Sequence, residues 1–299
     1  MKRKKIDENQ ISFFDIELPP NEPEAIEKAI KSTPVVVETA PPKISFARVP
    51  DEEFKSKYPF KDRPTVSGIL KLLEKGSAKY GKHEFLSDVF ECGAIAISNR
   101  FDFQRAEERE KQYLQIIKKY DKESVQILTQ VFAEIYRLLT AQIFVGFDDY
   151  LGQLYMQSET SNSRSGQFFT PYCISKMCAE CVCDKGKIDK AMEQDEILTM
   201  HEPTVGAGGM VIAAADVLYN KYHFNISRNL LVECGDIDKR CVHMTYLQLG
   251  LAGIPAVIFH RNGITLETWD RWETPAYIMQ YSRFKNFFKG TPSDWSEAK

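Results

Sequence analysis

A glycine-rich turn is the part of the sequence best suited to chemistry. It runs Glu202-Pro203-Thr204-Val205-Gly206-Ala207-Gly208-Gly209-Met210 and separates a short apolar run, 197–201, from an alanine-rich stretch, 209–222. Gly206 and Gly208 allow the backbone to turn tightly and to approach a ligand with no Cβ in the way. Such a turn between a strand and a helix predicts a ligand site, but many nucleotide-binding folds have one, so it does not identify the ligand.

Two acidic residues follow the next apolar run. That run, 229–232, is followed by Asp236 and Asp238, and Asp236 lies thirty residues after Gly206. In an open α/β sheet, an acidic side chain in this place can accept hydrogen bonds from both hydroxyls of a ribose. The structural alternative is that Asp238 caps the next helix and Asp236 is merely solvated, which suits Asp238 better than Asp236.

The elements that must position these residues alternate between strand and helix. Strands are expected at 197–201, 229–232 and 256–259, and helices at 209–222 and 239–251. This order predicts an α/β fold with a parallel, doubly wound sheet, whose ligands bind beyond the carboxyl ends of the strands.

The chain before the sheet falls into two parts. From 65 to 155, apolar residues recur at three- and four-residue steps, which predicts an α-helical domain. The first fifty residues are rich in proline and charge and predict a flexible arm. The expected domains are therefore the arm 1–50, a helical domain 51–160, a cofactor domain 161–284 and a tail 285–299.

Three separated motifs resemble the S-adenosylmethionine site of adenine-N6 DNA methyltransferases, in particular the modification subunits of type I restriction systems. The family pattern is Gly-Gln-aromatic-Phe-Thr-Pro, then an Asp-Pro-Thr-x-Gly-x-Gly-Gly turn, then an acidic residue that closes the second strand. This chain has Gly166-Gln167-Phe168-Phe169-Thr170-Pro171, the turn from Glu202, and Asp236 in the same order. The resemblance covers about residues 65 to 270 and implies a Rossmann-like methyltransferase domain that stops early.

The resemblance also implies roles for individual residues. The segment Gln167, Phe168, Phe169, Thr170, Pro171 and Tyr172 would wrap the methionine end and the adenine of the cofactor. The turn residues Thr204, Val205, Gly206 and Gly208 would face the amino-acid moiety, with Glu202 near its ammonium group. Asp236 would bind the ribose hydroxyls, Ile237 would flank the adenine ring, and Asn262 would lie near the adenine amine. Phe168 and Phe169 could instead be core residues.

The catalytic motif of that family is the element we do not find. Its Asn-Pro-Pro-aromatic tetrapeptide follows the fourth strand, and an Asn or Asp there accepts the hydrogens of the flipped adenine amine. We place the fourth strand at 275–280, so that Tyr281, Ser282, Arg283 and Phe284 occupy the catalytic position, where only the aromatic residue is kept. A second polypeptide would then complete the enzyme, or the chain binds cofactor without catalysis, or it is a fragment.

Four cysteines near the first motif raise a metal alternative. Cys173, Cys178, Cys181 and Cys183 begin with the spacing of a plant-type iron–sulfur loop. The segment 171–182 is predicted to be helical, so we favour buried thiols in a supporting helix and expect no metal.

The amino-acid composition limits the classes of partner that the chain can be expected to bind. The chain has 39 basic and 42 acidic side chains, a balance of −3, which disfavours binding to nucleic acid by bulk charge but allows a local basic face. No apolar run approaches the ~20 residues that span a bilayer, and the basic start of the chain is not followed by a signal-peptide core. We expect a cytoplasmic protein with no membrane contact and with reduced thiols.

A short peptide in the arm suggests another partner. Gln10, Ile11, Ser12, Phe13 and Phe14 are similar to the peptides by which bacterial proteins bind the replication sliding clamp, although the same residues could anchor the arm on the body of the protein. The leading interpretation is an S-adenosylmethionine-binding DNA methyltransferase-like protein, with DNA bound through a partner subunit. The alternative is a non-catalytic scaffold recruited through residues 10–14, and a nicotinamide-dependent oxidoreductase comes third because the turn lacks the Gly-x-Gly-x-x-Gly spacing.

Overall fold

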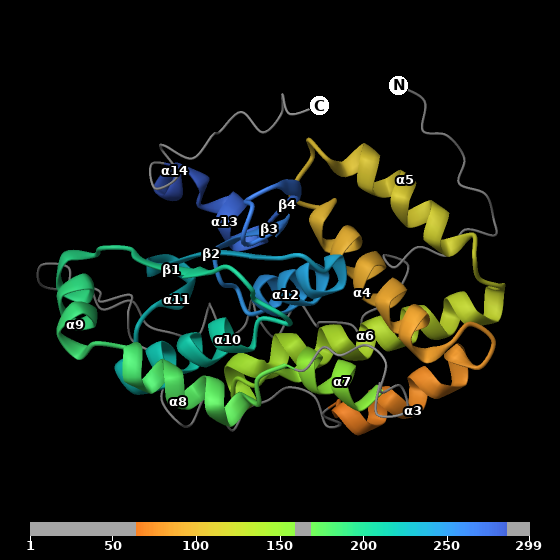
Figure 1. The fold of residues 1–299 in the computed structure, drawn as a ribbon, viewed down its shortest axis with the longest axis horizontal. Helices are drawn as coiled ribbons and strands as arrows, with labels where there is room; N and C mark the ends of the chain where they lie inside the picture. The colour runs from red at the N-terminus through yellow and green to blue at the C-terminus, as the bar shows by residue number, and fades with distance from the viewer. Residues whose placement is uncertain (1–63, 159–168, 286–299) are drawn as a thin grey trace, which may run out of the picture. The chain divides into compact units, whose positions relative to one another are not determined.

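The computed structural model describes residues 64–158 and 169–285, which all lie in one compact unit (Figure 1). The helices of residues 64–158 are α3 (Val66–Ser77), α4 (Lys82–Ser98), α5 (Ala106–Ile117), α6 (Lys122–Val145) and α7 (Tyr150–Ser158). The clamp-like peptide at residues 10–14 lies outside the described residues and stays a prediction. Within the described ranges, no helix has the length and apolar character needed to cross a membrane.

The helical pattern predicted for 65–155 is confirmed. Side chains cap two of these helices, because Thr65 accepts a hydrogen bond from the Gly68 N–H and Asp121 accepts one from the Ser124 N–H. Helix α3 packs on α6, and α4 packs on α5 and α6. Helices α4, α6 and α7 also pack on a helix of the sheet layer, so the helices and the sheet share one core. The expected domain boundaries remain predictions.

The second part of the chain forms a four-stranded sheet with its helices. The strands are β1 (Leu198–Glu202), β2 (Leu230–Asp236), β3 (Ala256–Arg261) and β4 (Thr268–Glu273), in the spatial order β1-β2-β3-β4. The helices are α8 (Tyr172–Val182), α9 (Lys185–Gln194), α10 (Gly209–Asp216), the π-helical turn η2 (Val217–Lys221), α11 (Ile226–Asn229), α12 (Lys239–Leu251), α13 (Pro275–Met279) and α14 (Tyr281–Phe284).

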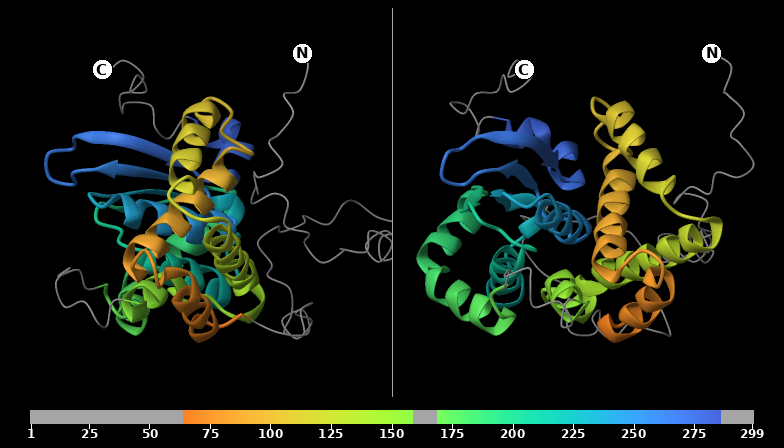
Figure 2. Two further views of the ribbon diagram at one scale, coloured as in Figure 1. Left: turned by 90° about the vertical axis from the view of Figure 1, so that its right-hand side faces the viewer. Right: turned by 45° about the vertical axis from the view of Figure 1, so that its right-hand side comes forward.

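The predicted parallel strands are confirmed: β1 is shifted by one residue, and β2 and β3 end later than predicted. β1 pairs with β2 and β2 pairs with β3, both in parallel register. Helices α10 and α12 lie on one face of the sheet and α13 and α14 on the other, as Figures 1 and 2 show. On the second face, Leu231, Val257 and Phe259 pack against Tyr277 and Phe284. Because both faces are covered, the middle strands are buried almost throughout.

The predicted fourth strand at 275–280 is wrong. The fourth strand is β4, residues 268–273, and it runs antiparallel to β3. Residues 275–279 form helix α13, which begins with Pro275 in the first turn. Proline is favoured there because its missing N–H and fixed φ suit the start of a helix. The Thr274 hydroxyl accepts from the Ala256 N–H at 2.9 Å and donates to the Ile254 carbonyl at 2.8 Å, which fixes the chain where β4 passes into α13.

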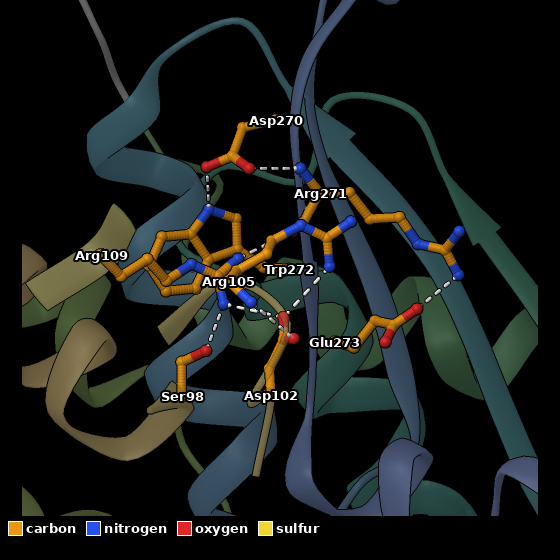
Figure 3. A network of polar contacts seen from close by, with 8 residues as sticks. All are labelled: Ser98, Asp102, Arg105, Arg109, Asp270, Arg271, Trp272 and Glu273. Atoms are coloured by element: carbon orange, nitrogen blue, oxygen red, sulfur yellow. Dashed lines mark hydrogen bonds and ion pairs between the residues drawn. The ribbon is translucent and has the colours of Figure 1, made fainter. Parts of the chain in front are cut away.

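A buried arginine joins the helices to β4 (Figure 3). Arg109 on α5 is 3% exposed, pairs with Asp102 at 3.1 Å and also contacts the Ser98 hydroxyl. Its guanidinium lies 3.8 Å from the ring centroid of Trp272 and donates to the main-chain carbonyl of Arg271 at 2.9 Å. The same side chain therefore neutralises a buried carboxylate and satisfies a carbonyl of β4 that β3 does not use.

Replacing this arginine should destabilise the protein strongly. We expect Arg109→Ala to lower the free energy of unfolding by about 3 kcal/mol, because the buried Asp102 would keep only its ion pair with the partly exposed Arg105 and the Arg271 carbonyl would lose its donor. Urea unfolding followed by circular dichroism measures the change. Lys111→Ala on the same helix is the control: its ion pair with Glu107 is exposed to solvent, so its loss should change the free energy of unfolding little. Equal losses in the two variants would contradict this account of Arg109.

Candidate functional site

The glycine turn has the backbone conformation that its sequence predicts. It joins β1 to α10, and Gly206 has φ +58° and Gly208 φ +100°. Residues with a Cβ disfavour this left-handed region, so glycine suits both positions. Gly209 begins α10, where an added Cβ would lie 2.8 Å from the Asp149 Oδ2. The close packing of the start of α10 on Asp149, the residue before α7, therefore also depends on a glycine.

Asp236 at the end of β2 binds the turn directly. Its Oδ2 accepts a hydrogen bond from the Gly206 N–H at 2.9 Å, and its Oδ1 accepts one from the Asp238 N–H at 2.9 Å. Each carboxylate oxygen has two lone pairs, so both can still accept a hydroxyl from a ligand. Asp238 caps α12 through the Arg240 N–H, as the structural alternative for that residue predicted.

Two side chains of α12 hold the carbonyls of the turn. The Thr245 hydroxyl donates to the Gly206 carbonyl at 2.9 Å, and the Gln248 amide donates to the Ala207 carbonyl at 2.7 Å. With the bond from Asp236, three side-chain groups fix two consecutive residues of the turn. Sequence reasoning missed Thr245 and Gln248, because they lie inside an apolar helix and have no local pattern.

A buried carboxylate connects this network to the first helices. Asp149, 5% exposed, accepts from the Gln248 amide at 2.7 Å and from the Gly152 N–H at 2.9 Å. Burial raises the pKa of Asp149, and these two hydrogen bonds offset part of that effect. Asp149 was also not predicted as a site residue, although an acidic residue before a helix is a signal for a cap.

The aromatic motif contributes one confirmed neighbour of the turn. The Phe169 ring lies against Gly206, 3.1 Å from the place of an added Cβ, and its centroid is 5.5 Å from that of Tyr155 on α7. Gln167 and Phe168 lie outside the described residues and stay predictions. Thr170 and Pro171 are exposed at the start of α8. The Tyr172 hydroxyl lies 3.1 Å from Asp216 at the end of α10, so this side chain points away from the turn.

The remaining cofactor candidates lie around the turn. Glu202 accepts from the Thr204 N–H at 3.3 Å, and Val205 is buried with its N–H bonded to the Gly235 carbonyl. Ile237 is 60% exposed directly after Asp236.

The predicted Asn262 organises the β3–β4 connection. Its Oδ1 accepts from the Ile264 N–H at 2.9 Å and from the Thr265 N–H at 3.2 Å. The next residue, Gly263, packs on the turn, because an added Cβ would lie 3.1 Å from the Pro203 carbonyl. The fold thus brings the β3–β4 connection to the edge of the sheet that carries the glycine turn, while contact between Asn262 and a ligand remains a prediction.

The four residues placed in the catalytic position lie elsewhere. Tyr281, Ser282, Arg283 and Phe284 form α14, and Phe284 is fully buried against Tyr277. Arg283 donates to the main-chain carbonyls of Asp195 and Arg228, which come just before β1 and β2. Helix α14 therefore lies at the amino ends of the parallel strands, opposite the glycine turn.

The cysteine helix is present, but its thiols are not buried as expected. Cys173 and Cys181 are exposed, and Cys178 and Cys183 are partly exposed. Helix α8 instead buries Ser175 and Ala179, one turn apart. In residues 64–158 and 169–285, no three His, Cys, Asp or Glu side chains lie together in a group that could hold a metal ion.

The ionisation of Asp149 gives a prediction that can be measured. Its pKa is higher in the folded than in the unfolded state, so the folded protein holds the proton more tightly. The protein therefore loses stability as the pH rises from the unfolded-state pKa to the folded-state pKa of Asp149. Asp149→Asn keeps an acceptor oxygen and has no charge. We therefore expect the variant to gain stability relative to the wild type as the pH rises above the ordinary aspartate pKa of about 4, measured by urea unfolding at a series of pH values. A difference that does not change with pH would exclude a raised pKa.

Comparison with known proteins agrees with the three motifs. Residues 146–291 match the family model described as N-6 DNA Methylase. No curated protein and no solved structure gave a significant match. The matched segment contains Asp149, the glycine turn, Asp236 and α14, so the family resemblance inferred from the sequence is confirmed for the part of the chain that forms the site.

Proposed function

We propose, from the match of residues 146–291 to the N-6 DNA Methylase family model, that this chain binds S-adenosylmethionine at the glycine turn and takes part in adenine-N6 methylation of DNA. The observation that carries the proposal is the hydrogen bond between Asp236 and the Gly206 N–H. It joins the acidic end of β2 to the turn after β1, which are the two elements that a nucleoside-containing cofactor uses in a parallel sheet.

The residues present fit such a cofactor. Asp236 retains lone pairs for ribose hydroxyls, and Ile237 offers an exposed apolar side chain beside it for the adenine ring. The Glu202 carboxylate has only a 3.3 Å contact with the Thr204 N–H and a 3.5 Å contact with its hydroxyl, so it is available to an ammonium group. When bound, S-adenosylmethionine supplies an electrophilic methyl group on its sulfonium. The chain's own residues bind and orient it, since their backbone is already fixed.

The finer assignment is part of the same proposal. We infer a modification-subunit-like role in which a partner supplies DNA recognition, because the resemblance is to subunits of type I restriction systems. The arm peptide at residues 10–14 is a second candidate contact, with a sliding clamp. In the alternative function, the chain keeps the fold as a scaffold and transfers no methyl group.

Cofactor binding is tested by calorimetry. The full chain should bind S-adenosylmethionine, and Asp236→Ala should weaken binding about 10- to 100-fold, because hydrogen bonds to a charged group contribute about 1.5–3 kcal/mol. Asp189→Ala is the matched control: it removes a partly exposed aspartate on α9 whose partner is Lys185, and it should leave the affinity unchanged. No binding by the wild type at millimolar ligand, or equal affinity in Asp236→Ala, would remove the site assignment.

Catalysis by the chain alone is a separate question. We expect the purified chain to transfer no labelled methyl group to adenine in duplex DNA, because no Asn-Pro-Pro-aromatic tetrapeptide follows Gly206 in its sequence. A filter assay with labelled cofactor measures the transfer, and a complete adenine methyltransferase is the positive control. Methylated adenine formed by this chain alone would show that other residues carry the chemistry.

A further inference from the structure

A cleft of about 500 Å³ lies between α5 and the β3–β4 hairpin. This volume is within the usual range of ligand sites. Its lining includes Arg105 and Glu108 near the start of α5, Lys239 at the start of α12, and His260 and Trp269 on the hairpin. None of these residues belongs to the proposed cofactor site.

An aromatic pair forms one wall. Trp269 is 47% exposed, and its ring centroid lies 4.9 Å from that of His260. The indole N–H donates to Glu267 at 3.0 Å, which holds the ring in place. A fixed, half-exposed indole is a surface on which any nucleobase can stack, because every base has a π face.

Cations line the rest of the cleft. Four basic residues, Arg105, Arg109, Lys239 and Arg271, face two acidic ones, Glu108 and Asp270. Asp270 accepts hydrogen bonds from the Trp272 indole and from the Arg271 N–H, so its oxygens are partly used. The lining therefore has more basic than acidic side chains, and each of its cations is also paired with a carboxylate outside the lining: Asp102, Glu91 or Glu273.

Two of these cations are exposed enough to reach a ligand. The side chain of Arg105 is 35% exposed and that of Lys239 is 41% exposed. Each is ion-paired, with Asp102 and Glu91 respectively. Arginine has five N–H donors and lysine three, so both can also bind a phosphate.

We propose that this cleft binds single-stranded DNA, with a base stacked on Trp269 and backbone phosphates at Arg105 and Lys239. The His260 imidazole lies 3.1 Å from the Ile237 carbonyl, so the cleft adjoins the residue that follows Asp236. An adenine that leaves the duplex for methylation is itself an unpaired, unstacked base, and enzymes of this kind also act on single-stranded substrate. The inference deepens the proposed function by adding a DNA contact, and in that respect rests on it.

The experiment is a fluorescence-anisotropy titration of a labelled single-stranded oligonucleotide with the full chain, without cofactor. Trp269→Ala should weaken binding about 5- to 100-fold, and Trp269→Phe should restore most of it, because stacking needs only a ring. Arg105→Gln should lower the salt dependence, the slope of log K against log [salt], by about 0.7, the value for one phosphate contact of a single strand. The unfolding midpoint of each variant is measured in parallel.

Matched controls separate the cleft from general effects. Tyr281→Ala removes an aromatic residue that is 54% exposed on α14, and Lys111→Gln removes an exposed cation on α5. Neither residue lines the cleft, so both variants should bind like the wild type. Equal losses in Trp269→Ala and Tyr281→Ala, tighter binding of duplex than of single strand, or no binding at low salt would overturn the proposal. Oligonucleotide binding by a chain that fails to bind S-adenosylmethionine would leave this inference standing and remove only the cofactor site.

Discussion

The hydrogen bonds that fix Gly206 and Ala207 are the constraint on which the candidate site depends. Asp236 holds the Gly206 N–H, Thr245 holds the Gly206 carbonyl, and Gln248 holds the Ala207 carbonyl. A glycine turn without such partners would have many accessible conformations, and ordering it would cost about 1–2 kcal/mol per residue on ligand binding. Here the three side-chain hydrogen bonds already order the turn without a ligand, so ligand binding would not have to supply this free energy.

Gln248 extends the constraint beyond the sheet. It is fully buried, donates to Asp149 and the Ala207 carbonyl, and accepts from the Leu151 N–H at 3.3 Å. The start of α7, helix α12 and the glycine turn therefore meet at one amide side chain. The helices before the sheet are part of the construction of the site, which agrees with a family match that begins at residue 146, ahead of α7.

The sequence predicted the parts of the site that follow from local pattern. Gly206, Gly208 and Asp236 were identified because turns and strand ends have characteristic residues at fixed places in the chain order. Gln248 and Asp149 were not, since they lie 99 residues apart and only the tertiary fold brings them together. The apolar run at 275–280 suits a buried strand as well as a short helix, and periodicity alone does not separate the two. In the structure, Pro275 in the first turn and the hydrogen bonds of Thr274 favour the helix over a strand.

The direction of β4 determines what the following chain can reach. β1, β2 and β3 run parallel and end at the glycine turn, whereas β4 runs back and brings Glu273 beside Val257 near the start of β3. Helix α14 is consequently separated from the turn by the length of the strands, about 17–20 Å for five or six residues. A rotamer change cannot close that distance. In the proposed reaction, the group that accepts the hydrogens of the adenine amine must therefore come from the edge that carries the turn, from residues outside the described ranges, or from a second chain.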